Sequence, residues 1–280
     1  MIDWKTLPKI DAHIHLMPPD VIENNRGNGD RFVEYGDISD YRKLMERYHI
    51  EAACIMPFND PYMLSMDFTV GSVHKNLLEL CRKSEGRLFC FADIDLRNPI
   101  ETTIEQLEKA MAQKEFIGVK IHPSNTGYPV DGAYYDRIFA WAEQNHVPVE
   151  IHSYPRTHLT DDVCSPSRIK KVLEEHPSLR VSVAHAGGFQ WEELIGLGLY
   201  CNISAILTDW ADRYGLQRTN ELLRQLDVKK LVFATDYPDN RRKKPEEIYD
   251  SYCELLGKMD FTPEEAADIC KHNALRMFGI

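Results

Sequence analysis

The sequence predicts an α/β protein that folds as a single (β/α)8 TIM barrel, and three observations lead to this fold class. Eight short apolar segments alternate with segments of helical periodicity, an order that favours parallel strands joined by crossover helices. Eight such units in roughly 230 residues close a barrel, with long βα loops and C-terminal closing helices. The chain has 280 residues, 43% of them hydrophobic, and no linker divides it. We therefore expect residues 1–280 to form one domain.

The expected first strand, residues 9–17, reads Lys-Ile-Asp-Ala-His-Ile-His-Leu-Met. Its polar and apolar side chains alternate with a period of two, which is typical of a strand with one apolar face. Asp11, His13 and His15 are therefore expected on the same polar face. The two imidazoles then have the backbone spacing that lets both rings reach one metal ion.

A long connection follows, residues 18–40, and it carries many Gly, Pro and Asn residues. A loop of this length inside a compact domain is usually functional or mobile, so we interpret it as a lid. Seven further strands are expected at residues 52–57, 88–94, 118–122, 148–152, 180–185, 199–204 and 230–236. Helices are expected at residues 41–48, 70–83, 101–114, 134–145, 166–176, 190–196, 219–225, 245–257 and 263–278. An open doubly wound sheet is the alternative, but no Gly-rich turn follows the first strand to bind a dinucleotide.

The composition argues against several classes of function. The net charge of −11, from 33 basic and 44 acidic residues, disfavours binding to nucleic acid or an anionic membrane. No apolar run approaches the roughly 18 residues of a membrane span, and the N-terminus lacks a signal-peptide pattern. Seven scattered cysteines, without a close Cys-x-x-Cys pair, favour reduced and packed thiols in a cytoplasmic protein. We expect a small-molecule substrate as partner and leave a homodimer open.

Polar residues stand where the expected strands end, and in such barrels the active site lies at those ends. The residues are His13, His15, His122, His152, His185 and Asp236. Zn²⁺ and similar ions bind imidazole nitrogen and carboxylate oxygen, with one position left open for water. Two histidines of the first strand, one of the fifth and the aspartate of the eighth supply such a set.

These motifs resemble those of a known superfamily when they are taken in order. His-x-His, Gly-Val-Lys-Ile-His-Pro, a strand-end His, Ala-His-Ala-Gly-Gly and Thr-Asp-Tyr-Pro resemble the amidohydrolase superfamily. More narrowly, they resemble the amidohydrolase-related branch, which includes metal-dependent hydrolases and non-oxidative decarboxylases such as aminocarboxymuconate-semialdehyde decarboxylase. The segment 271–278 is also similar to the C-terminal helix of that branch.

The resemblance implies a divalent metal ion as cofactor, Zn²⁺ with Mn²⁺ as the alternative. It implies the metal ligands His13, His15, His152 and Asp236. By the same resemblance, His185 lies beside the metal, where it either coordinates a second ion or polarises the substrate.

The expected fourth strand carries Lys120, for which two roles are open. Superfamily members with two metals often bridge them by a carboxylated Lys, or a Glu, from this strand. Alternatively, Lys120 forms a buried pair with Glu150 on the next strand, since an isolated buried charge is very costly. We favour the buried pair and expect Asp11 in the same layer. His122 would then line the pocket, either as a substrate contact or as a group that supports the metal ligands.

Further substrate contacts are expected beyond the strand ends. Tyr154 and Arg156 follow the fifth strand, and Trp210 follows the seventh. The other histidines fall on expected helices or their ends and are interpreted as surface or packing residues: His49, His74, His146, His176 and His272.

The expected reaction is hydrolysis of an amide, ester or lactone by a metal-activated water, and the residue types alone do not separate it from decarboxylation. Asp236 is expected to act as general base and His185 to stabilise the developing oxyanion. The alternative is non-oxidative decarboxylation of a small aromatic or unsaturated acid, and a non-catalytic metal-binding barrel is the third hypothesis. The His-x-His motif departs from the Glu-x-His of salicylate-type decarboxylases, which favours hydrolysis.

Overall fold

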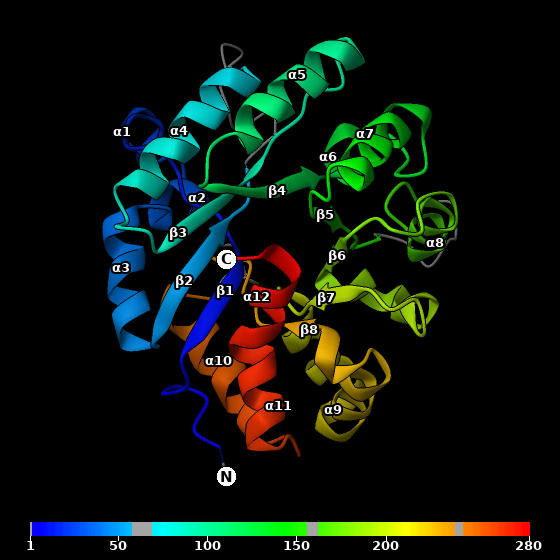
Figure 1. Cartoon of the computed structure of the whole chain (residues 1–280). Coiled ribbons are helices and arrows are strands. Elements are labelled where there is room, and N and C mark those ends of the chain that lie inside the picture. Colours follow the sequence, from blue (N-terminus) through cyan, green and yellow to red (C-terminus); the bar gives the residue numbers. More distant parts are fainter. Residues whose placement is uncertain (1, 58–68, 156–161, 239–242) are drawn as a thin grey trace.

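The computed structural model describes residues 2–57, 69–155, 162–238 and 243–280, and it confirms the predicted (β/α)8 barrel. Eight parallel strands in these residues pair in the order of the sequence (Figure 1). They are β1 (Lys9–Ile14), β2 (Ile50–Ile55), β3 (Leu88–Ala92), β4 (Phe116–Ile121), β5 (Val149–His152), β6 (Val181–Ala184), β7 (Tyr200–Asn202) and β8 (Leu231–Val232). Bonds from Ala12 N to Phe233 O (3.0 Å) and from Asp236 N to His13 O (2.9 Å) join the last strand to the first.

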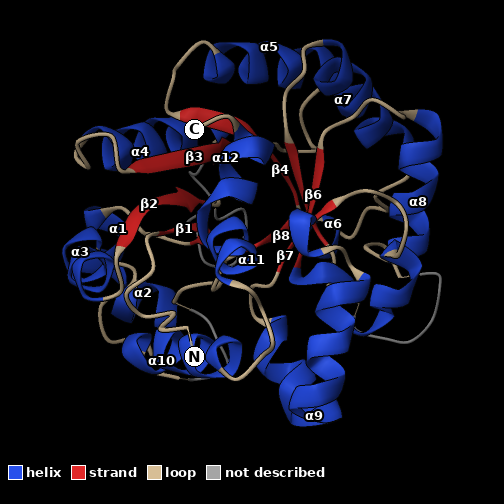
Figure 2. Cartoon of the chain, turned by 60° about the horizontal axis from the view of Figure 1, so that its bottom comes forward, coloured by secondary structure: helices blue, strands red, loops and turns tan. Residues whose placement is uncertain are grey.

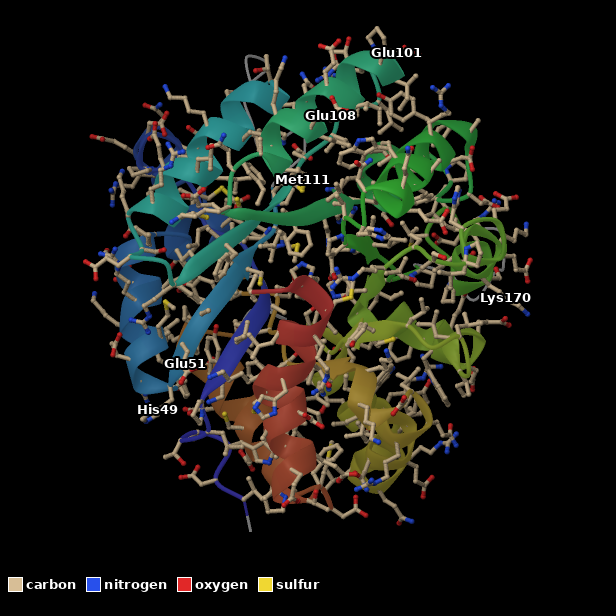
Figure 3. The ribbon with its side chains drawn as sticks, viewed as in Figure 1. His49, Glu51, Glu101, Glu108, Met111 and Lys170 are labelled. Atoms are coloured by element: carbon tan, nitrogen blue, oxygen red, sulfur yellow. The ribbon has the colours of Figure 1, made fainter. Side chains whose placement is uncertain are left out.

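Helices surround the strands (Figure 2). They are α1 (Pro19–Asn25), α2 (Arg31–Tyr35), α3 (Ile38–Arg47), α4 (Val70–Arg82), α5 (Ile100–Met111), α6 (Pro123–Thr126), α7 (Ala133–Gln144), α8 (Pro166–Glu175), η1 (His185–Leu194), α9 (Ile206–Gln225), η2 (Val228–Lys230), α10 (Pro245–Gly257), α11 (Pro263–Ala267), η3 (Asp268–His272) and α12 (Asn273–Phe278). Each amphipathic helix buries its apolar side. In α5, for example, Leu107 is buried while Glu101 and Glu108 face solvent (Figure 3).

The segment 18–40 differs from the long loop that the sequence predicts. It contains α1, α2 and the start of α3. Asp30 accepts a hydrogen bond from Phe32 N (2.8 Å), and Asp37 accepts one from Ser39 N (2.6 Å). Each aspartate therefore caps a helix, and such caps satisfy the free amides of a first turn. The Gly and Pro residues of this segment lie at or between the ends of two short helices, so the whole segment is not irregular.

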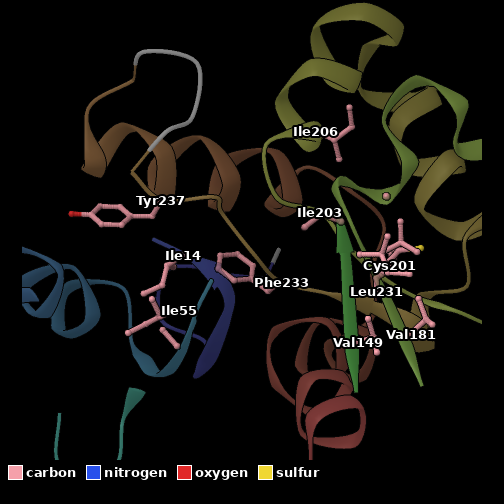
Figure 4. Close-up of a cluster of buried hydrophobic side chains, with 14 of the residues drawn as sticks. Ile14, Ile55, Val149, Val181, Cys201, Ile203, Ile206, Leu231, Phe233 and Tyr237 are labelled. Atoms are coloured by element: carbon pink, nitrogen blue, oxygen red, sulfur yellow. The ribbon is translucent and has the colours of Figure 1, made fainter. Parts of the chain in front are cut away.

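Buried apolar residues of successive strands separate into two clusters because neighbouring side chains on a strand point to opposite faces. The inner cluster contains Ile10, Ala12, Cys54, Phe91, Val232 and Ala234, together with Met277 and Phe278 of α12. The outer cluster joins the strands to the helices and includes Ile14, Ile55, Val149, Val181, Cys201 and Leu231 (Figure 4). The inner face of the barrel is therefore apolar where α12 packs against it.

The expectation that Asp11 shares a face with the two histidines is wrong. Ile10 and Ala12 belong to the inner cluster, whereas Asp11 bonds Tyr249 of the outer helix α10. The pairing of β1 with β2 shows the cause, because three residue steps from Asp11 to Ile14 oppose only two on β2. This is a β-bulge, which adds one residue to a strand and reverses the alternation beyond it. Asp11 consequently does not join the layer of Lys120.

All seven cysteines are buried free thiols, which confirms that they are packed residues. Within the described part of the chain, none of the helices has the length and apolar character needed to cross a membrane.

Candidate metal centre

The carboxyl ends of the strands bring five of the expected residues together. His13 Nε2 lies 3.3 Å from Asp236 Oδ1, and His15 Nε2 lies 3.5 Å from the same oxygen. His185 Nε2 lies 3.1 Å from His152 Nδ1. Ligand atoms of His13, His185 and Asp236 all lie within 4.8 Å of one another. The centre thus draws on β1, on the end of β5, and on the residues that follow β6 and β8.

These spacings fit a bound cation. Ligand atoms about 2.1 Å from a tetrahedral Zn²⁺ are separated by about 3.4 Å, close to the contacts that Asp236 makes with both histidines. Burial is the largest cause that lowers the pKa of His13 and His152 well below the usual value, and neighbouring Lys120 and histidines add to it. These imidazoles are therefore neutral at pH 7 and offer lone pairs to a metal ion.

Asp236 stays ionised although it is mostly buried. Burial raises its pKa, but a hydrogen bond from His15 and the electrostatic influence of His185, His15 and Lys120 outweigh burial, so the pKa falls below its usual value. Asp236 also adopts a φ of 63°, a left-handed conformation that non-glycine residues rarely take. The bond from its amide to His13 O holds this conformation, and such strain is common at functional sites.

The tautomer of His185 follows from its neighbours. Its Nδ1 lies 2.9 Å from Ser204 O and 3.0 Å from Ser204 Oγ. The Ser204 hydroxyl donates to Asn202 Oδ1 (2.6 Å), so towards His185 it can only accept. Nδ1 of His185 must therefore carry the proton, and Nε2 presents a lone pair to the centre. Burial lowers the pKa of His185 to about 4, which keeps the ring neutral.

The Glu150 carboxylate contacts the ring nitrogen of His13 that points away from Asp236. His13 Nδ1 lies 3.5 Å from Glu150 Oε1 and 3.3 Å from Asn202 Nδ2, and Asn202 Nδ2 donates a hydrogen bond to Glu150. A carboxylate that accepts from the far nitrogen of a metal-binding histidine fixes the ring and raises its basicity. Asn202 and Ser204 were missed from the sequence. The alternating Asn-x-Ser at the end of the seventh strand is the signal that points to them.

Lys120 and Glu150 share a layer, as predicted. They are directly paired in the register of β4 and β5, and both are completely buried. The direct contact expected between them is not formed, because Lys120 Nζ and Glu150 Oε2 have no hydrogen-bond partner among the described residues. Burial lowers the pKa of Lys120 and raises that of Glu150, and each charge opposes the shift of the other.

Comparisons with known proteins decide the family. The sequence matches the family model described as "Amidohydrolase" over residues 10–280. The chain belongs to the amidohydrolase family. A comparison with curated proteins finds no match.

Solved structures share the fold of this amidohydrolase. A 2,6-dihydroxybenzoate decarboxylase from Rhizobium is 17% identical, with a TM-score of 0.70 over 98% of this chain and 99% of the other. An amidohydrolase from Burkholderia multivorans with bound zinc is 17% identical, with a TM-score of 0.70 over 98% and 99%. A dihydroxybenzoic acid decarboxylase from Polaromonas sp. JS666, with bound manganese and the inhibitor 2-nitroresorcinol, is 15% identical, with a TM-score of 0.70 over 98% and 97%.

The residues expected to contact substrate lie in different surroundings in this amidohydrolase. His122 stacks on His152 with ring centroids 3.8 Å apart. The Tyr154 ring lies 5.8 Å from that of His185. Trp210 is completely buried, its indole donates to Gly188 O (3.0 Å) and its ring packs against Trp191, so it joins α9 to η1. Arg156 lies outside the described residues.

The helix α2 contributes an aromatic residue that the sequence did not single out. Phe32 packs edge-on against His15, with ring centroids 5.3 Å apart and planes at 86°. Phe32 is only partly buried. The segment 18–40 therefore contacts the metal centre of this amidohydrolase directly.

The five histidines expected on helices or their ends are surface or packing residues, as predicted. His49, His146 and His272 are exposed. His74 is buried and accepts a hydrogen bond from Asp93 N (2.9 Å). His176 lies 2.9 Å from Asp136 between two outer helices.

Proposed function

We propose that this amidohydrolase is a metal-dependent hydrolase of a small carbonyl compound, such as an amide, ester or lactone. The observation that carries the proposal is the ionised Asp236, whose Oδ1 lies 3.3 and 3.5 Å from the Nε2 atoms of His13 and His15. His13, His15, His152 and Asp236 would hold one divalent ion, and the bound zinc and manganese of two structural neighbours support Zn²⁺ or Mn²⁺.

The chemistry divides between the ion and the chain. A divalent ion in this centre would lower the pKa of a water molecule to about 7 and polarise a carbonyl. Asp236 would accept the proton of the attacking water and return it to the leaving group, because it is a carboxylate held at the open end of the barrel. A general base of this kind typically contributes about 10²–10⁴-fold to the rate.

The tautomer of His185 refines its role. Its only N–H is bonded to Ser204, so its Nε2 cannot donate to an oxyanion while the ring is neutral. We therefore assign His185 to the ligands of the ion or to holding the attacking water as an acceptor. Tyr154, whose ring lies beside that of His185, and His122 remain proposed contacts of the substrate.

Decarboxylation of a small aromatic acid is the second candidate function. Two of the structural neighbours are decarboxylases of dihydroxybenzoates, and the same centre could hold the carboxylate and hydroxyl of such an acid. The His-x-His motif favours hydrolysis, so decarboxylation stands second.

A parallel assay separates these functions. The zinc- and manganese-loaded protein would be tested on a panel of esters, lactones and amides and, separately, on hydroxybenzoates with detection of carbon dioxide. Asp236→Asn is the control for both arms. We expect hydrolysis that this variant slows about 10²–10⁴-fold. Release of carbon dioxide without hydrolysis would support the second candidate, and inactivity in both arms would favour a non-catalytic barrel.

A further inference from the structure

The carboxylate of Asp11 lies on the outer face of β1 and makes four hydrogen bonds. Its Oδ1 accepts from His13 N (3.3 Å) and Thr235 N (3.1 Å). Its Oδ2 accepts from Thr235 Oγ1 (2.6 Å) and from Tyr249 OH (2.6 Å). Asp11 is completely buried, so it must be satisfied by these donors. One side chain therefore joins β1, the end of β8 and α10.

The bulge lies between Asp11 and Ile14, and it decides where His13 points. In a regular strand, residues 11 and 13 share a face, so an outward Asp11 would place His13 outside the barrel. The extra residue on β1 reverses this alternation, so that Ala12 and His13 both face inward. The bond from His13 N to the Asp11 carboxylate lies across this bulge.

The same carboxylate holds the partner of His13. Thr235 donates both its amide and its hydroxyl to Asp11, and the next residue is Asp236. The amide of Asp236 in turn donates to His13 O (2.9 Å). Asp11 thus bonds both β1 and the residues that follow β8, and it does so from the face of β1 that points away from the centre.

We propose that Asp11 is a positioning residue, which maintains the β1 bulge and thereby turns His13 towards Asp236 at the metal centre. This inference rests on the proposed function, because it treats His13 and Asp236 as groups that bind a divalent ion. Asp11 touches neither the ion nor the substrate. It acts by selecting which face of β1 presents the imidazole.

The test combines zinc affinity with the register of β1. We expect Asp11→Ala to bind Zn²⁺ about 10- to 100-fold more weakly than the wild type in a chelator competition, the range typical of residues that orient metal ligands. Its crystal structure should show β1 paired without the bulge and His13 displaced. Asp11→Asn, which keeps an acceptor for the two amides, should fall between, and Tyr249→Phe should lose less because it removes one bond of four.

Tyr48→Phe is the matched control, because Tyr48 stacks on Tyr249 and bonds Asp250 (2.9 Å) at the opposite end of the barrel. It should lose stability but keep its zinc affinity. If Asp11→Ala fails to fold, Asp11→Asn and Tyr249→Phe decide the question. Wild-type affinity in the Asp11 variants, or an intact bulge in Asp11→Ala, would overturn the inference. A wild-type protein that binds neither Zn²⁺ nor Mn²⁺ would instead refute the proposed function, and the strand register would still test the role of Asp11 in the bulge.

Discussion

At the scale of single residues, the positions of the protons decide which atoms of the centre can bind a metal ion or accept a proton. Ser204 accepts from His185 Nδ1 and thereby directs a lone pair of that ring to the centre. Glu150 and Asn202 contact the far nitrogen of His13. Asp236 is an ionised group beside the neutral rings of His13, His152 and His185, which makes it the expected acceptor of a proton.

The substitution Asp236→Asn separates metal binding from proton transfer. Asn retains an oxygen ligand but is a poor proton acceptor, so much of the metal should stay while kcat falls about 10²–10⁴-fold. Metal content and steady-state kinetics on the best substrate of the panel measure both effects. His152→Ala is the comparison, since activity there should fall in proportion to metal occupancy. Near wild-type kcat in Asp236→Asn at full occupancy would transfer the role of base to another residue.

Buried His74 predicts a loss of stability in acid. Burial lowers its pKa from 6.5 to about 4, so the unfolded chain binds the proton more tightly. The free energy of unfolding should therefore fall as the pH drops from about 6.5 to about 4, by up to about 3 kcal/mol. Urea unfolding of metal-free protein across this range should show a steeper fall for wild type than for His74→Gln, which keeps an acceptor for Asp93 N. Equal slopes would contradict the prediction.

The residues of the centre could be predicted from the sequence because barrel strands end at one face, and polar residues there have few structural uses. The face of β1 on which Asp11 lies could not be predicted from the sequence. The bulge that decides it involves a hydrogen bond from Thr235, which is 224 positions away along the chain. Arrangements of this kind are decided by tertiary contacts, and a local period of two cannot report them. Trp210 was misjudged for a similar reason, since its indole bonds a backbone carbonyl, Gly188 O, 22 positions away.

At the scale of elements, the segment 18–40 remains the proposed lid, now with helices in it. Its position is linked to the centre through Phe32 on His15. Backbone hydrogen bonds, such as the one from Met17 N to Gly36 O (2.9 Å), hold the segment to the residues that follow β1. The two aspartate caps show how the sequence could have predicted the helices, since each stands just before a helical turn.

Hydrogen exchange tests the lid. Zinc should fix the ring of His15, and a bound product should add contacts, so amides of residues 31–35 should exchange more slowly in the presence of both. Amides of α7, on the outside of the barrel, provide the internal reference. Slow exchange in residues 31–35 that neither zinc nor product alters would show that the segment is a fixed part of the wall.

At the scale of the whole molecule, the barrel contains a polar layer between its apolar core and the metal centre. Lys120 and Glu150 form the charged part of this layer. The register of the two strands could be predicted because both carry a polar residue two positions before a strand-end histidine. Their separation could not be predicted, since it depends on Asn202, which binds Glu150 from a third strand.

Unfolding measurements test this layer. Lys120→Met removes the buried charge that neighbours Glu150 in the strand register, and it should lower the unfolding free energy by less than the roughly 3–5 kcal/mol typical of breaking a buried ion pair, because the two groups are not in direct contact. Lys120→Met combined with Glu150→Gln removes both charges and should recover a large part of that loss. A double variant as unstable as the single one would show that the two charges do not compensate one another.

The metal content of protein purified without chelator tests the central claim most directly. We predict one divalent ion per chain in the wild type, unchanged in folded Lys120→Met and lost in His13→Ala. Two ions in the wild type, with one lost in Lys120→Met, would show that Lys120 bridges a pair of metals. A wild-type protein that contains no metal and takes up neither Zn²⁺ nor Mn²⁺ would contradict the claim that these strand ends form a metal centre.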